Sequence, residues 1–228
     1  MKLVHIADLH LGKKISGYSM LEDQKFFLNS LIEYMNNSDI HHLLIAGDIY
    51  DTSTPSGETI NAFDEFITNL SRNKIKAFII AGNHDSNDRV GYASSLLTDN
   101  DIYINSDIKK AITPVKVDGV NFYLIPYTSK TEIEVAFGKE LNSIEEAMSF
   151  LIEQMNLNKE ETNVALAHQL VLPVSGTYEK GGSEDPVVGA VQNIPSHVFK
   201  DFDYVALGHI HKADYQNTNI VYPGSAIS

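Results

Sequence analysis

Short apolar runs, each followed directly by polar side chains, recur along this chain and predict its central strands. They are rich in aliphatic and β-branched residues and cover residues 3–7, 43–46, 77–81, 164–167 and 204–207. Near-continuous apolar runs of this length are typical of strands that are buried on both faces. We therefore expect five strands in the interior of the protein.

Segments with helical spacing lie between these runs. Apolar residues recur with a period near 3.6 over residues 27–35, 60–70 and 144–155, which predicts helices that cover a sheet. Alternating strands and helices in the first half indicate right-handed βαβ units. In the second half, residues 112–125 with the turn Asp118-Gly119 predict a β-hairpin, so we expect more antiparallel pairing there. The predicted class is α/β, with two mixed sheets between helices.

The length of 228 residues fits one large domain that buries a full core. The sequence shows no internal repeat, low-complexity tract or interdomain linker. Residues 173–195 are rich in Gly, Ser and charged side chains and predict a long loop. Because this loop starts just after His168, it either borders the substrate channel or is a mobile surface loop.

Side chains that can bind metals follow each of the five apolar runs. The motifs are Asp8-x-His10, Gly47-Asp48-x-x-Asp51, Gly82-Asn83-His84-Asp85, Ala167-His168 and Gly208-His209-Ile210-His211. In layered α/β folds ligands bind at the carboxyl ends of the strands, so segments far apart in sequence can converge at one edge. The motifs therefore predict a two-metal phosphoesterase site.

The spacing within the motifs favours paired ligation. Residues i and i+2 of an extended segment share a face, so Asp8 with His10, and His209 with His211, can each grip one cation. Asp48 directly follows a central strand and is the natural bridge between two cations roughly 3.5 to 4 Å apart. Asn83 would add a neutral carbonyl oxygen. Cysteine is absent, and a set of carboxylate, carbonyl and imidazole ligands suits manganese, our first choice, or iron or zinc.

The same motifs suggest a mechanism for hydrolysis of a phosphate ester. Two cations would polarise the phosphoryl group, lower the pKa of a bridging water and stabilise the attacking and leaving oxygens. His84 is not needed to complete the metal shell and is placed to act as general acid. Asp51 is either the carboxylate that orients His84 or a turn residue. Asp85 is expected to cap the following helix, and the other histidines are expected in the core, at strand edges or on a helix surface: His5, His41, His42 and His197.

The formal net charge of −13 argues against broad neutralisation of nucleic-acid phosphates. Several of the negative charges are predicted metal ligands, however, and two divalent cations would reverse the local field. Lys13, Lys14, Arg89 and Lys212 lie beside the motifs, where they are either a positive rim or solvated surface charges. There is no signal-peptide pattern and no apolar run near the roughly 20 residues of a membrane span, so we expect a cytoplasmic protein.

The five motifs in this order resemble the calcineurin-type metallophosphoesterases, a superfamily with a four-layer sandwich of two mixed sheets flanked by helices. Within that superfamily, residues 1–12, 47–55, 204–212 and the Tyr-Pro-Gly-Ser at 222–225 are similar to the SbcD family, the nuclease subunits of bacterial SbcCD complexes. The resemblance implies a manganese-dependent DNA nuclease, with exonuclease action on duplex ends and endonuclease action on hairpins. It further implies a dimer that works with an SbcC-like ATPase in DNA repair, recombination and replication.

The resemblance also implies roles for single residues. One metal would be held by Asp8, His10, Asp48 and His211, and the other by Asp48, Asn83, His168 and His209. His84 resembles the catalytic histidine of the family. Archaeal and eukaryotic relatives have a histidine at the position of Asp51, so this chain follows the bacterial pattern, which favours the dyad of Asp51 with His84.

Members of the SbcD family continue past the Tyr-Pro-Gly-Ser segment into a capping domain and a helical region that docks SbcC. Residues 1–228 are therefore expected to be the nuclease domain alone. The family dimerises through helices that correspond to about residues 57–71 and 86–98, whose apolar residues could equally belong to the core. Two alternatives stay open: a small-molecule phosphodiesterase or phosphatase of the same superfamily, which suits an acidic protein, and a non-catalytic scaffold subunit that binds DNA ends.

Overall fold

The structure, a computed structural model, describes residues 1–172, 193–215 and 219–226. The predicted loop over residues 173–195 lies outside this part of the chain, apart from its last three residues. Two of those, Ile194–Pro195, form the short strand β11, which pairs in parallel with β10 (Val171–Leu172).

The first sheet is built from β1 (Val4–Ile6), β4 (His42–Ala46), β5 (Lys76–Ile80) and β6 (Ile102–Asn105), in that order. All neighbouring strands are parallel, so each connection has to cross over the sheet. Two crossovers are the helices α1 (Leu21–Asn37) and α2 (Gly57–Arg72). The predicted strands and helices are confirmed here, but the sheet is purely parallel and not mixed.

The second sheet has the order β13-β14-β12-β9-β8-β7. Its strands are β7 (Val115–Val117), β8 (Val120–Ile125), β9 (Thr162–His168), β12 (Tyr204–Gly208), β13 (Asp214–Tyr215) and β14 (Ile220–Tyr222). Antiparallel pairing occurs only at the two edges, between β7 and β8 and between β13 and β14. The expectation of a more antiparallel second half is therefore correct only for these edges.

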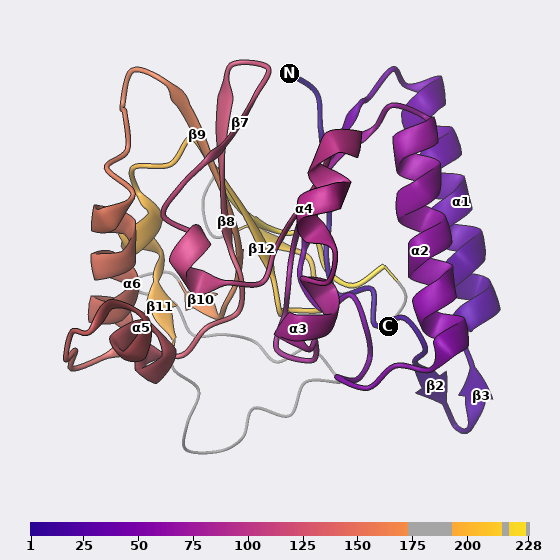
Figure 1. Cartoon of the computed structure of the whole chain (residues 1–228), viewed down its shortest axis with the longest axis horizontal. Helices are drawn as coiled ribbons and strands as arrows, with labels where there is room; N and C mark the ends of the chain where they lie inside the picture. Colours follow the sequence, from indigo (N-terminus) through magenta and orange to yellow (C-terminus); the bar gives the residue numbers. More distant parts are fainter. Residues whose placement is uncertain (173–192, 216–218, 227–228) are drawn as a thin grey trace.

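The hairpin of β7 and β8 turns at Asp118 and Gly119, as predicted. Both residues have positive φ angles, 49° and 81°, which the two-residue turns of hairpins need. A second hairpin joins β2 (Lys14–Ile15) to β3 (Tyr18–Ser19) through Ser16 and Gly17. This hairpin projects beyond the ends of α1 and α2 (Figure 1).

Helix α6 (Ile144–Gln154) is confirmed, whereas α5 (Lys130–Phe137) was not predicted. Helix α5 begins with a capping box between Ser129 and Glu132 and ends at Gly138 in the left-handed region. The remaining elements are one-turn pieces: α3 (Asn87–Val90), α4 (Ser94–Leu97) and the 3-10 turns η1 (Thr98–Asn100), η2 (Ile108–Lys110) and η3 (Ser196–Phe199).

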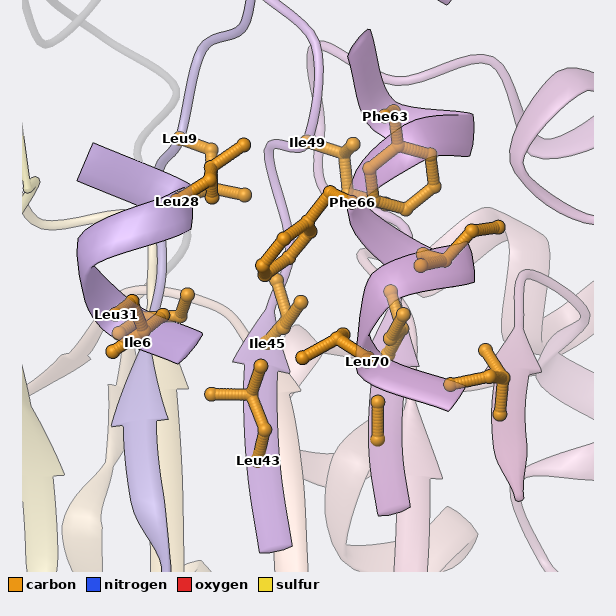
Figure 2. Close-up of a cluster of buried hydrophobic side chains, with 14 of the residues drawn as sticks. Ile6, Leu9, Leu28, Leu31, Leu43, Ile45, Ile49, Phe63, Phe66 and Leu70 are labelled. Carbon is orange, nitrogen blue, oxygen red and sulfur yellow. The ribbon is translucent and has the colours of Figure 1, made fainter. Parts of the chain in front are cut away.

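The two sheets face each other, with α1 and α2 outside the first and α5 and α6 outside the second (Figure 1). Three apolar clusters fill the spaces between these layers. Figure 2 shows the outer cluster of the first sheet, where Phe66 and Leu70 of α2 pack over Ile45 of β4. Between the sheets, the rings of Phe78 and Phe122 stack with centroids 3.8 Å apart. The predicted α/β class with two sheets flanked by helices is confirmed.

Candidate metal centre

The carboxyl ends of β1, β4, β5, β9 and β12 meet at one edge of the paired sheets. Within the first sheet, the N–H of Asp8 donates to the carbonyl of Gly47 over 3.1 Å, and the N–H of His10 donates to the backbone carbonyl of Asp48 over 3.0 Å. Across the sheets, Nδ1 of His168 lies 2.7 Å from the carbonyl oxygen of Ala46. The N–H of His84 donates to Oδ1 of Asp48 over 2.9 Å, and the N–H of His209 donates to Oδ1 of Asp8 over 3.0 Å. Direct hydrogen bonds therefore join all five motif loops.

Glycines in three motifs allow this close approach. A Cβ atom on Gly208 would overlap the carbonyl oxygen of Ala46, and one on Gly47 would overlap the ring of His168. A Cβ atom on Gly82 would run into Asp48. Because interiors are close-packed and cannot absorb such overlaps, glycine at these positions determines how closely the two sheets approach at this edge.

Four motif residues have strained backbone. The φ angles of Asp8, His10, Asp48 and His209 are 54°, 42°, 50° and 93°, in a region that residues with a Cβ rarely adopt. Each such residue costs on the order of 1 kcal/mol and persists only where its surroundings hold it. Strain of this kind clusters at functional sites, and here it lies at the ends of three strands.

The carboxylate of Asp48 lies at the centre of the cluster. Its Oδ2 is 3.4 Å from Nε2 of His168, 3.7 Å from Nε2 of His10 and 4.0 Å from Nε2 of His84. Asp48 is 2% exposed. One carboxylate oxygen that faces imidazoles from three different loops has the geometry expected of a bridge between two cations.

The predicted ligands form two neighbouring groups around Asp48. In the first, ligand atoms of Asp8, His10 and His211 lie within 4.8 Å of one another, and Nε2 of His10 is 3.0 Å from Nε2 of His211. In the second, Asp8, Asp48 and His168 meet the same limit. Oδ1 of Asn83 lies 3.0 Å from Nε2 of His168 and 3.0 Å from Nδ1 of His209. All seven predicted ligands are thus brought together, while metal binding itself stays a prediction.

The donor set fits divalent cations. Two imidazole nitrogens 3.0 Å apart, as in His10 and His211, repel through their lone pairs unless a proton or a cation lies between them. Burial lowers the pKa of His10 to about 3 and that of His209 to about 4, so both are neutral, the form that binds metals. Burial, the largest single effect, also acts to lower the pKa of His168, but the carboxylates of Asp48 and Asp8 and the carbonyl of Ala46 together outweigh it and raise that pKa to about 9. A cation beside Asp48 would therefore displace a proton.

His84 and Asp51 meet in a way that differs from the predicted dyad. Nδ1 of His84 donates to the backbone carbonyl of Asp51 over 3.0 Å; the carboxylate of Asp51 instead has its Oδ1 3.6 Å from Nδ1 of His10. That nitrogen of His10 is buried and makes no hydrogen bond with the part of the chain that the structure describes. The carboxylate of Asp51 thus faces a predicted metal ligand, and the side chain of His84 is 45% exposed beside the cluster.

Asp85 connects two of the motif loops, and its prediction as a helix cap is wrong. Its Oδ2 accepts from the N–H groups of Ile49 (3.1 Å) and Gly82 (2.8 Å), and its Oδ1 from that of Tyr50 (2.9 Å). Helix α3 instead starts after Ser86, without a side-chain cap. Burial raises the pKa of Asp85, although the three N–H groups oppose this.

Two further supports of the centre were not predicted. Gln24 of α1 is 2% exposed; its amide donates to the carbonyls of Leu9 (3.0 Å) and His10 (2.8 Å) and accepts from Gly12 (3.0 Å). Ser225 donates its hydroxyl proton to the carbonyl of Asp8 over 2.9 Å. A polar residue in the buried stripe of an amphipathic helix, as Gln24 is, was the available signal.

The other histidines lie where the sequence predicts. His5 lies in β1, with Nδ1 3.1 Å from the hydroxyl oxygen of Tyr204. His42 starts β4 and pairs with Asp118 over 2.8 Å, whereas the side chains of His41 and His197 are 47% and 53% exposed.

Two hollows flank the centre. One, of about 640 Å³, is lined by Asp51, Lys14 and residues at the start of α2. The other, of about 530 Å³, is lined by Tyr127 and lies against α3 and α5. The ring centroid of Tyr127 is 6.3 Å from those of both His168 and His209, so this hollow opens beside the second ligand group. Tyr127 was not predicted, because an aromatic residue just after a strand carries no specific sequence signal.

Comparisons with known proteins agree with this arrangement. The family model of the calcineurin-like phosphoesterases matches residues 1–213. The curated SbcD protein of Staphylococcus epidermidis, a nuclease component of SbcCD, is 34% identical over 232 residues, which take in 100% of this chain and 61% of that protein. The crystal structure of TT1561 of Thermus thermophilus has a TM-score of 0.56 at 10% identity and covers 97% of this chain and 88% of that one. This likeness shows the fold alone.

The chain spans less than two thirds of the length of that curated relative. Among the described residues, no helix is long and apolar enough to cross a membrane. The family match over residues 1–213 includes every motif loop that meets at the edge of the sheets. This chain belongs to the calcineurin-like phosphoesterase family.

Proposed function

We propose that this chain is the nuclease domain of an SbcD-like protein and hydrolyses phosphodiester bonds in DNA with the help of two divalent metal ions. One observation carries the proposal: the seven predicted ligands and His84 lie together in a chain that aligns along its whole length with a curated nuclease subunit. Exonuclease action on duplex ends and endonuclease action on hairpins are the corresponding activities.

The residues divide the work of hydrolysis between them. Asp8, His10, Asp48 and His211 would hold one ion, and Asp48, Asn83, His168 and His209 would hold the other. When bound, the ions supply Lewis-acid polarisation of the phosphoryl group and a nucleophilic water; the oxygen and imidazole ligands suit manganese first, and also iron or zinc. His84 is the general acid. Its Nδ1–H donates a hydrogen bond to the carbonyl of Asp51, which turns Nε2 toward the centre, where Nε2–H can protonate the leaving oxygen.

The surroundings of the centre suit a chain-like substrate. The hollow lined by Asp51 lies beside the metal cluster, so a strand whose scissile phosphate is at the metals can continue along it. Lys14 also lines this hollow and can contact a phosphate there. The formal charge of −13 favours the second candidate, a small-molecule phosphodiesterase with the same centre. The complete set of predicted ligands argues against the non-catalytic scaffold, because a scaffold does not need such a set.

A homodimer and an SbcC-like ATPase are the proposed partners, and DNA repair, recombination and replication the proposed setting. The curated relative is named as a subunit of SbcCD, which supports an SbcC-like ATPase as a partner of this chain. For the dimer, Tyr92 just before α4 and Leu96 within α4 are 81% and 72% exposed and lie in the stretch 86–98 that is expected to dimerise. In α2, by contrast, Phe63, Phe66 and Leu70 are buried in the core.

The test uses end-labelled duplex and hairpin DNA with the small ester methyl p-nitrophenyl phosphate alongside. Each is incubated with the chain in manganese or in chelator, and His84→Ala is compared with His197→Ala, which changes an exposed histidine on η3. We expect manganese-dependent DNA cleavage that His84→Ala loses and His197→Ala keeps. Hydrolysis of the small ester without DNA cleavage would favour the small-molecule phosphodiesterase, and no metal-dependent hydrolysis of either would overturn the proposal.

A further inference from the structure

The hollow beside the centre, here called the Tyr127 hollow, is enclosed by the start of α3, the turn η2, the segment after β8 and helix α5. Its volume of about 530 Å³ falls in the range of about 300 to 1,000 Å³ typical of small-molecule sites. None of the predicted metal ligands lines it. The hollow is therefore distinct from the metal centre but adjacent to it, because Tyr127, which lines the hollow, also lies near two predicted ligands.

The lining of the Tyr127 hollow includes an aromatic and an aliphatic side chain. Tyr127 follows the buried Pro126 and is 39% exposed. Its N–H donates to the carbonyl of Ala81 over 2.9 Å, which fixes the backbone of Tyr127 against the end of β5. Val135 of α5, which is 79% exposed, lines the same space. An aromatic side chain held by a fixed backbone, with an aliphatic residue in the same lining, suits a flat aromatic ring.

Polar groups in the hollow can read the edge of such a ring. Asn87, Ser106 and Thr131 line it, and none of their side chains hydrogen-bonds to another of the described residues. Amide and hydroxyl groups offer both donors and acceptors, as the edge of a nucleobase requires.

The charges in the hollow argue against a phosphate group as its occupant. Three carboxylates line it, from Asp88, Asp107 and Glu132, against the single ammonium of Lys109. Two of the carboxylates accept hydrogen bonds from backbone N–H groups, Asp107 from Lys109 and Glu132 from Ser129. A dianionic or polyanionic ligand would meet repulsion here, whereas an uncharged ring would not.

We propose that the Tyr127 hollow is a nucleobase subsite, in which a base next to the scissile phosphate stacks on Tyr127 outside the base stack of the substrate. The inference rests on the proposed hydrolysis of nucleic-acid phosphodiesters. Tyr127 lies beside two predicted ligands of the second group, His168 and His209. Because only one sugar separates a base from its phosphate, a nucleotide whose phosphate is at these ligands can place its base in the Tyr127 hollow. The subsite favours substrates whose end or loop is unpaired, because taking a base out of a duplex costs stacking and pairing energy.

The test compares p-nitrophenyl phosphodiesters that differ only in the second alcohol. The 5′ and 3′ nitrophenyl phosphates of thymidine are compared with the corresponding esters of an abasic deoxyribose and of methanol. The readout is kcat/KM for a thymidine ester divided by kcat/KM for its abasic counterpart, a ratio in which effects on the shared chemistry cancel. Tyr127→Ala removes the ring, Tyr127→Phe keeps it, and Val135→Trp fills the hollow from an exposed position. Tyr34→Ala, on an exposed tyrosine of α1, is the matched control.

We expect the wild type to prefer at least one thymidine ester and Tyr127→Ala to lower that preference by roughly 5- to 100-fold, the usual effect of losing a base–aromatic stack. Val135→Trp lowers it as well, while Tyr127→Phe and Tyr34→Ala keep it. Equal rates for thymidine and abasic esters, or a preference that survives both Tyr127→Ala and Val135→Trp, would overturn the subsite. If the wild type hydrolyses none of these esters but cleaves DNA, the thymine base gives no advantage and the subsite is again overturned, whereas failure to hydrolyse both the esters and DNA would instead refute the proposed function.

Discussion

Replacing Asp85 by asparagine tests whether this partly buried carboxylate holds the motif loops in place. The carboxylate accepts three backbone N–H groups, from Ile49, Tyr50 and Gly82. An asparagine has a single carbonyl oxygen. If that oxygen takes the place of Oδ2, it keeps the bonds to Ile49 and Gly82, and the amide NH₂ then opposes the N–H of Tyr50. In the other orientation two of the three bonds are lost.

The magnitude follows from this count. One unsatisfied N–H group costs about 1 to 3 kcal/mol, and hydrogen bonds to a neutral oxygen are weaker than those to a carboxylate. We therefore expect Asp85→Asn to lower the free energy of unfolding by about 2 to 4 kcal/mol. The loop from Gly82 to His84 would shift as well, and affinity for manganese should fall with it.

The assay is urea unfolding in chelator at neutral pH, followed by circular dichroism, with metal titration in parallel. Asp88→Asn is the matched control, because Asp88 is an exposed acid three residues further on. It has the same change of charge and should lie within about 0.5 kcal/mol of the wild type, as surface substitutions usually do. Equal stability of Asp85→Asn and Asp88→Asn would refute the assigned role of Asp85.

Substitutions at Gly208, His5 and Asp51 test three other features of the structure. Gly208→Ala places a methyl group against the backbone of β4 and should lower the free energy of unfolding by several kcal/mol or abolish soluble expression. Gly57→Ala adds its methyl group in open space and should do neither. Equal urea midpoints for the two variants would contradict this prediction. Burial lowers the pKa of His5 to about 3, so His5 binds a proton in the unfolded chain but not in the folded chain as pH falls below about 6.5. The free energy of unfolding should therefore fall between pH 7 and pH 5, and this fall should be about 2 kcal/mol smaller in His5→Leu. An equal fall in His5→Leu and the wild type would refute the assigned effect of His5. Asp51→Asn should weaken manganese affinity about 10-fold through His10 and keep kcat at saturating metal; a fall in kcat with unchanged affinity would instead favour the dyad with the general acid.

The strands and main helices were predictable because burial on both faces leaves a continuous apolar run and burial on one face leaves a 3.6-residue period. Each motif lies at the end of such a run, so its place in space follows from the topology alone. Helix α5 was missed although Ser129 and Glu132 form a capping box, because its eight residues bury only Ile133 and show no clear period. The strand β6, Ile102–Asn105, was also missed, because its apolar run has only three residues and no metal-binding motif follows it.

What the sequence could not supply is which atom of a residue makes a contact. The predicted pair of Asp51 and His84 does meet, but through the backbone carbonyl, since the turn directs the carboxylate to His10. Asp85 was predicted as a helix cap, because an acidic residue before a helix usually is one. Its actual partners include N–H groups 35 and 36 residues earlier, which only the folded arrangement of the loops brings within reach.

The most direct test of the account is the number of manganese ions that one chain binds at equilibrium at neutral pH. Two saturable sites per chain are predicted, because Asp48 is placed between two groups of ligands. Asp48→Asn should weaken both sites together, and Asp88→Asn should bind two ions as the wild type does. A wild-type chain that binds one ion or none at saturating manganese, or an Asp48→Asn variant that loses only one site and keeps the other at full affinity, would contradict a bridged two-metal centre.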